Sequence, residues 1–201
     1  MTNIISRQSP ITRTIGLAIL FFWGTASYAE WSLEPQDSSL HFISVKATNI
    51  AEVHSFEKIR ATISGKGAVK LEIDLASVNT LIPIRDQRMR DYLFEVVAFP
   101  KATVYAQILI DDLEKLPSGS SRKTQISANL EFKELKSDLL AEVIVSRLND
   151  KTVMVQSDTP LILSAANLQV ENNLERLREI AGLPTISSAI PVTFRLTFSK
   201  D

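Results

Sequence analysis

Cysteine is absent from this chain, and glycine and proline are scarce, at 6 and 8 of 201 residues. Without cysteine, the protein cannot form a disulfide, a thiolate metal site, a cysteine nucleophile or a lipid anchor attached through sulfur. With so little glycine and proline, and no low-complexity segment, the sequence shows no linker between domains. The formal charge is only −1, which excludes the broad basic surface typical of nucleic-acid-binding proteins. Stability must come from a hydrophobic core, for which the chain is long enough.

Long apolar runs are also rare, and the single one, IGLAILFFW at Ile15–Trp23, lies near the N-terminus behind two arginines. It is too short to span a bilayer, and Ser27 and Ala29 then supply the small residues that a signal peptidase requires. We predict that residues 1–29 are a cleaved signal peptide and that Glu30 begins a soluble periplasmic protein. Its formal charge would be −3, because two of the 22 basic residues and none of the 23 acidic ones are removed. An uncleaved membrane anchor is the alternative.

Most of the remaining sequence alternates apolar and polar residues with a period of two, the pattern of strands with one buried face. The apolar residues expected on that face are Leu40, Phe42, Val69, Leu71, Ile73, Leu75, Val104, Ala106, Ile108, Ile110, Ile126, Ala128, Leu130, Phe132, Val143, Val145, Val153, Val155, Val192, Phe194, Leu196 and Phe198. Two segments depart from this rhythm and are predicted to be helices, Pro83–Leu93 and Asn173–Ala181, the second capped by Asn172 or Asn173. The pattern predicts an all-β barrel or sandwich and does not separate the two.

Four short elements occur in a fixed order in the middle of the chain: SVNT at Ser77–Thr80, RD at Arg85–Asp86, LF at Leu93–Phe94 and FPKAT at Phe99–Thr103. In this order they resemble the signature of the YceI-like family of periplasmic polyisoprenoid-binding proteins. The resemblance extends from Trp31 to Phe198. It implies a lipocalin-like antiparallel β-barrel of about eight strands with one or two short helices, a size that can hold one small ligand.

The resemblance assigns residues 30–201 to a single lipid-binding barrel domain, but the sequence departs from the family pattern at two places. Lys133-Glu134 replace a glycine usual in a strand turn, and Asn167-Leu168 replace a Phe-Gly pair usual before the last helix. Both places lie near strand ends. We therefore expect altered loops on an intact barrel, and a ligand that can differ from the family's usual one.

The resemblance also implies a hollow interior. The apolar stripes by themselves do not, because they would equally form a solid core. The predicted tunnel lining is Phe42, Val69, Leu71, Ile73, Val104, Ala106, Ile108, Leu130, Phe132, Val143, Phe194 and Leu196. Arg85 and Arg88 are the candidates for contact with a polar head group at the mouth. For Arg85 the alternative is structural, since Arg85 and Asp86 could fasten the helix to the barrel through charge-assisted hydrogen bonds.

The two histidines, His41 and His54, lie on either side of an expected hairpin turn. If that turn is centred between Ala47 and Thr48, the two side chains are cross-strand neighbours on one face. Two imidazoles there could share a metal or respond to pH. Two ligands are fewer than the three or four of a zinc site, so no metal is assigned. The alternative is two histidines that hydrogen-bond to nearby groups.

Three functional hypotheses follow. The first is an exported, non-enzymatic protein that holds an apolar amphiphile, such as a polyisoprenoid, an isoprenoid quinone or a fatty amide, with no cofactor and no nucleic-acid partner. The second is an interaction or stress-accessory module whose barrel is filled by side chains. The third, a periplasmic hydrolase, has little support, because the sequence contains no nucleophile elbow, triad or phosphate-binding loop. The identity of the lipid and the oligomeric state, a dimer included, are left open.

Overall fold

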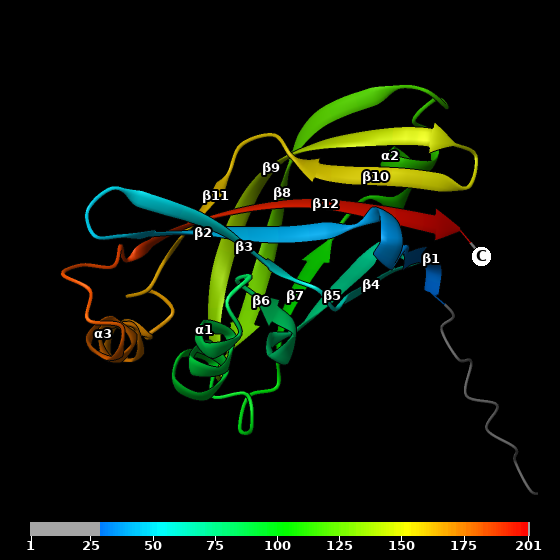
Figure 1. The fold of residues 1–201 in the computed structure, drawn as a ribbon. Helices are drawn as coiled ribbons and strands as arrows, with labels where there is room; N and C mark the ends of the chain where they lie inside the picture. The colour runs from blue at the N-terminus through cyan, green and yellow to red at the C-terminus, as the bar shows by residue number, and fades with distance from the viewer. Residues whose placement is uncertain (1–28, 201) are drawn as a thin grey trace, which may run out of the picture.

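β-Strands make up most of the protein in the computed structural model, which describes residues 29–200 (Figure 1). The strands are β1 (Ala29–Leu33), β2 (Ser39–Lys46), β3 (Ile50–Phe56), β4 (Ile59–Ser64), β5 (Ala68–Asp74), β6 (Val78–Asn79), β7 (Lys101–Gln107), β8 (Ser121–Phe132), β9 (Leu135–Asn149), β10 (Thr152–Ser157), β11 (Leu161–Ser164) and β12 (Ala189–Lys200). The helical segments are η1 (Pro35–Asp37), η2 (Leu75–Ser77), α1 (Pro83–Arg88), the π-helical η3 (Met89–Phe94), α2 (Ile110–Glu114) and α3 (Glu171–Ile180). The predicted signal peptide lies outside the described residues, apart from Ala29 at the start of β1.

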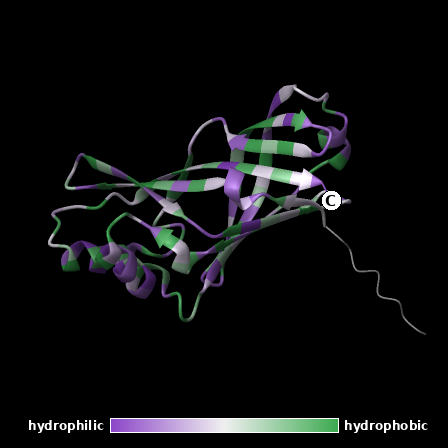
Figure 2. Cartoon of the chain, turned by 45° about the vertical axis from the view of Figure 1, so that its right-hand side comes forward, coloured by the Kyte–Doolittle hydropathy of each residue, from purple (hydrophilic) through white to green (hydrophobic). Residues whose placement is uncertain are grey.

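Eight antiparallel strands close into a barrel in the order β1, β4, β5, β7, β8, β9, β10 and β12. The ring closes because β12 pairs with β1, with Leu33 opposite Phe198. Apolar and polar bands alternate along these strands (Figure 2), as the period-two pattern predicts. The apolar side of each strand faces inward and forms the core. The structure thus confirms an all-β fold and an eight-stranded barrel.

Strand β12 changes partners along its length, and this elongates the barrel at one end. Its C-terminal half pairs with β10 and β1, whereas residues 189–195 pair with β11 and β2. The β2–β3 hairpin therefore continues the wall beyond the closed ring, with β6 added at the edge of β3. Helices α1 and α3 lie at this elongated end, and α2 lies at the opposite end (Figure 1).

Both predicted helices form, with one correction. Helix α1 begins at Pro83, whose missing N–H costs nothing in a first turn, and η3 extends the helical segment to Phe94. Helix α3 begins at Glu171 after Val170, so the predicted asparagine cap is wrong. The side chain of Asn173 instead donates a hydrogen bond to the carbonyl of Tyr92, over 2.6 Å, and fastens α3 to η3. Within residues 29–200, no helix is long and apolar enough to cross a membrane.

Strand β7 ends at Gln107, so the predicted strand through Ile110 is wrong. Ile108 donates a backbone hydrogen bond to Gly67 at the β4–β5 turn, and a side chain on Gly67 would meet the Ile108 carbonyl at 2.1 Å. Ile110 then begins α2, which buries Leu113. The run from Ile108 to Ile110 is apolar throughout, and such short runs do not distinguish a strand end from a helix start.

The turn at Lys133-Glu134 joins β8 to β9 with the barrel intact. Both residues have positive φ, 47° and 66°, as a two-residue hairpin turn requires. The ammonium of Lys133 pairs with Glu95, the residue directly after η3. The departure from the family pattern therefore links the β8–β9 turn to the loop that follows η3.

Candidate functional site

The barrel encloses an apolar cavity of about 310 Å³. Apart from His41, every residue that lines it is alanine, valine, leucine, isoleucine or phenylalanine. All twelve residues predicted to line a tunnel border this cavity. An apolar space of this size does not favour ordered water, which needs polar partners. The interior of the barrel is therefore hollow and apolar.

Small side chains on facing strands explain why the interior is not filled. Ala106 on β7 lies directly opposite Ala128 on β8, and Ile126 lies opposite Ala141 on β9. All four point into the cavity. Cross-strand partners on one face lie close together, so a pair of alanines leaves space where two larger residues would meet. The barrel geometry thus opens a cavity at the alanines.

A row of phenylalanine rings forms one wall of the cavity. The ring centroids are 5.4 Å apart between Phe42 and Phe56, 5.6 Å between Phe56 and Phe94, and 6.4 Å between Phe94 and Phe132. These separations are those of favourable tilted and edge-to-face aromatic pairs. The row joins β2, β3, η3 and β8, and the imidazole of His54 extends it, 5.0 Å from Phe42. Period-two reasoning did not find Phe56 or Phe94 as lining residues.

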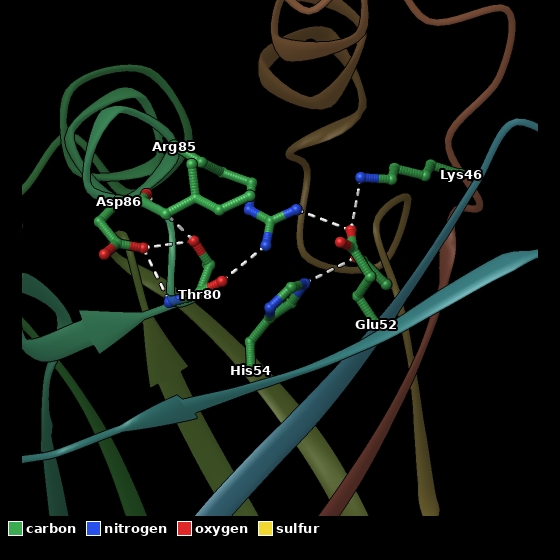
Figure 3. A network of polar contacts seen from close by, with 8 residues as sticks. Lys46, Glu52, His54, Thr80, Arg85 and Asp86 are labelled. Atoms are coloured by element: carbon green, nitrogen blue, oxygen red, sulfur yellow. Dashed lines mark hydrogen bonds and ion pairs between the residues drawn. The ribbon is translucent and has the colours of Figure 1, made fainter.

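A polar network fastens α1 to the β2–β3 hairpin at the elongated end (Figure 3). Arg85 donates from Nη1 to Glu52 Oε2 and from Nη2 to the Thr80 carbonyl, over 2.6 and 2.7 Å. Lys46 Nζ lies 2.6 Å from the same oxygen of Glu52. Asp86 accepts hydrogen bonds from both the backbone and the hydroxyl of Thr80. Arg85 and Asp86 thus have the fastening role raised as the alternative, and nothing in the strand pattern pointed to Glu52 as the partner.

The charges of this network shift two pKa values. Hydrogen bonds from Lys46, and then from Arg85, hold the pKa of Glu52 below its ordinary value. Burial, and then the positive charge of Arg85, lower the pKa of His54. His54 is only 3% exposed, and its Nε2 lies 2.8 Å from Ser44 Oγ. Its Nδ1 and the Nε of Arg85 are buried without a hydrogen-bond partner.

The predicted pairing of His41 with His54 is wrong. His41 lies opposite Ser55, and His54 lies opposite Phe42. The turn contains three residues, 47–49, two of them with positive φ, instead of being centred between Ala47 and Thr48. A shift of one residue moves a side chain to the other face of the strand, so the two histidines cannot share a ligand. Among the described residues, no three His, Asp or Glu side chains gather as a metal site.

Arg88, the second head-group candidate, lies in the last turn of α1 and is partly exposed. Within residues 29–200 it forms no ion pair, unlike Arg85. Arg88 therefore keeps an unpaired positive charge at the end of the barrel where the polar network lies.

Comparison with known proteins agrees with this geometry. The family model of the YceI-like domain matches residues 31–198. A polyisoprenoid-binding domain from Saccharophagus degradans, implicated in plant cell wall breakdown, is 36% identical, with a TM-score of 0.85 over 87% of this chain and 100% of that one. No curated protein matches.

More distant solved structures share the fold. BcnA from Burkholderia cenocepacia is 17% identical, with a TM-score of 0.64 over 82% of this chain and 98% of that one. The YceI protein of Campylobacter jejuni is 15% identical, with a TM-score of 0.55 over 74% of this chain and 84% of that one.

Proposed function

Because the chain belongs to the YceI-like family, we propose that it is an exported periplasmic protein that holds an apolar amphiphile in its barrel. A polyisoprenoid, an isoprenoid quinone and a fatty amide all have the required long apolar chain. The observation that carries this proposal is the cavity, whose lining is hydrocarbon on almost every side. The 36% identical polyisoprenoid-binding domain supports the same class of ligand.

The energetics suit a long apolar chain without directional partners. Each buried CH₂ group contributes roughly 0.8 kcal/mol of stabilisation, so a chain of several isoprene units gains affinity from length alone. A polar head group has no partner along the lining and would stay at the rim near α1, β2 and β3. Such binding requires no cofactor and no catalytic step.

Two substitutions on neighbouring residues test this proposal. Ile108 lines the cavity, whereas Gln107 is exposed on the outer face. We expect Ile108→Trp to abolish retention of the lipid, because the indole would occupy its space, while Gln107→Trp should leave retention unchanged. Overpacking a filled core costs about 1–3 kcal/mol, and a vacant tunnel should accept the ring at less cost.

The measurement is native mass spectrometry of protein purified from the periplasm of its own cells, followed by lipid extraction. Urea unfolding of the same samples reports the stability of each variant. The carrier function is wrong if the parent protein carries no lipid. It is also wrong if Ile108→Trp unfolds and the parent protein never bound a lipid.

A further inference from the structure

Four consecutive apolar residues, Leu81 to Ile84, are exposed where the chain passes from β6 into the first turn of α1. Leu81 is 83% exposed, Ile82 42% and Ile84 60%. Single exposed apolar residues are common on protein surfaces, but a run of this kind costs solubility and favours aggregation unless something covers it.

The backbone of this run is held in an unfavourable conformation. Leu81 has a φ of 62°, in the left-handed region that a bulky side chain rarely adopts. Its N–H donates to Asn79 Oδ1 over 2.8 Å, which fixes the turn. Asparagine or glycine would accept this conformation at lower cost. The chain thus has a strained leucine at a position where its side chain projects into solvent. Strained backbone conformations are common at functional positions.

The run lies close in the chain to one wall of the cavity. Strand β6 ends two residues before Leu81 and pairs with β3 at Phe56, a residue of the cavity lining. Thr80, the residue before the run, accepts the hydrogen bond from Arg85, which also holds Glu52 on β3 (Figure 3). The polar network therefore fixes the exposed run at the end of the barrel where α1 and the β2–β3 hairpin meet.

The charge next to the run indicates what covers it. Arg88 follows Ile84 by one helical turn, so the two side chains lie on one face of α1. Arg88 forms no ion pair within residues 29–200, because Asp86, two residues before it, accepts hydrogen bonds from Thr80, and Asp91, three residues after it, accepts one from Gln87. Exposed apolar side chains, with an unpaired cation one helical turn away, match the acyl and phosphate layers of a phospholipid surface.

We propose that Leu81, Ile82 and Ile84 insert into the interface of a phospholipid bilayer, with Arg88 at the level of the phosphates. Docked in this way, the rim of the cavity faces the bilayer, and an apolar cargo can pass between them with little exposure to water. The role in cargo transfer rests on the proposed function, but the docking itself does not.

Flotation with lipid vesicles tests the docking. Protein purified after export is mixed with vesicles of phosphatidylethanolamine and phosphatidylglycerol, and the bound fraction is measured after centrifugation. We expect Leu81→Asn with Ile84→Ser to lower the partition coefficient at least tenfold, because two apolar side chains no longer insert. Asparagine keeps the positive φ, so the variant should melt at or above the temperature of the parent.

Leu109→Asn is the matched control, since Leu109 is 74% exposed and directly precedes α2, which lies at the opposite end of the barrel (Figure 1). It should bind vesicles as the parent does. Arg88→Gln should weaken binding to phosphatidylglycerol vesicles about fivefold and leave binding to neutral phosphatidylcholine vesicles unchanged. A parent that does not float, or a double variant that floats equally well, overturns the proposal.

Native mass spectrometry of the same samples separates this inference from the proposed function. A parent protein that floats but never carries a lipid would overturn the carrier function and leave the docking in place. A parent that carries lipid but does not float would overturn the docking alone. The docking would also be overturned if the apolar run bound another protein and the parent did not bind vesicles.

Discussion

At the scale of single residues, His54 is the side chain with the most unusual surroundings. It is buried beside Phe42, close enough to Arg85 for that positive charge to lower its pKa, and only one of its ring nitrogens has a hydrogen-bond partner. A neutral imidazole is the form that such a site favours, because a second cation next to Arg85 would be both desolvated and repelled. We therefore expect acid to destabilise the polar network around His54.

We predict that the free energy of unfolding falls as the pH is lowered below about 6.5, the ordinary pKa of histidine. The folded protein, whose His54 pKa is lowered, resists protonation that the unfolded chain accepts, so acid favours unfolding. The contribution of neutral His54 to stability is present above the pKa that His54 has in the unfolded chain. It is lost as the pH falls through the lower pKa that His54 has in the folded protein. Urea unfolding at pH 7.5 and pH 5.5 measures the difference.

His54→Gln should abolish most of this pH dependence, because glutamine does not titrate and can still bond Ser44. His41→Gln is the matched control on the other face of the hairpin, and it should keep the dependence. Equal pH profiles for His54→Gln and the parent would show that His54 is not the responsible group. Glu52, with its own lowered pKa, acts at lower pH, since its contribution is lost only below about 4.5.

At the scale of elements, the contact between α1 and β3 fastens the helix to the elongated end of the barrel. The guanidinium of Arg85 binds Glu52 on β3 and the carbonyl of Thr80 after β6, so one side chain joins three segments. Lysine has a single ammonium and cannot make this forked contact. The π-helical η3 then brings Phe94 into the aromatic row.

We predict that Arg85→Lys lowers the free energy of unfolding by about 1–2 kcal/mol, the loss expected for a charge-assisted hydrogen bond that is not replaced. Arg90→Lys, on the same helical segment, should cost less than about 0.5 kcal/mol because Arg90 makes only longer, exposed contacts. A double-mutant cycle with Glu52→Gln isolates the pair. A coupling energy near zero would mean that Arg85 and Glu52 do not stabilise each other.

At the scale of the whole molecule, closure of the barrel separates stability from ligand binding. The ring of eight strands closes through pairing between strands alone, and the buried residues around it form one continuous core. A bound apolar chain would add contacts to a framework that is already closed. Loss of the ligand should therefore lower the stability of the protein without unfolding it.

We predict that protein stripped of lipid keeps its β-sheet circular dichroism and melts at a lower temperature than the loaded form. A ligand present at a hundred times its Kd stabilises the folded state by about 2.7 kcal/mol. Adding back the extracted lipid to stripped protein should restore the melting temperature, and adding it to Ile108→Trp should not. An unchanged melting temperature for the parent would argue against a ligand in the cavity.

The sequence by itself determined most of the barrel strands, the buried face of each and the family. These follow from local patterns, because a period of two between neighbouring residues fixes which side chains share a face. Val104, Leu130 and Phe194 could be placed on the buried faces of their strands on that basis alone. The order SVNT, RD, LF and FPKAT likewise needed no tertiary information.

Only the tertiary structure decided the register of His54, the partner of Arg85 and the hollow interior. The three-residue turn after β2 moved His54 by one position, and no local pattern specifies whether a turn has two or three residues. Glu52 and Arg85 meet although 33 residues separate them. The cavity exists because Ala106 and Ala128, on different strands, face each other once the ring has closed. Each of these features depends on contacts between distant segments, which form only when the whole barrel packs.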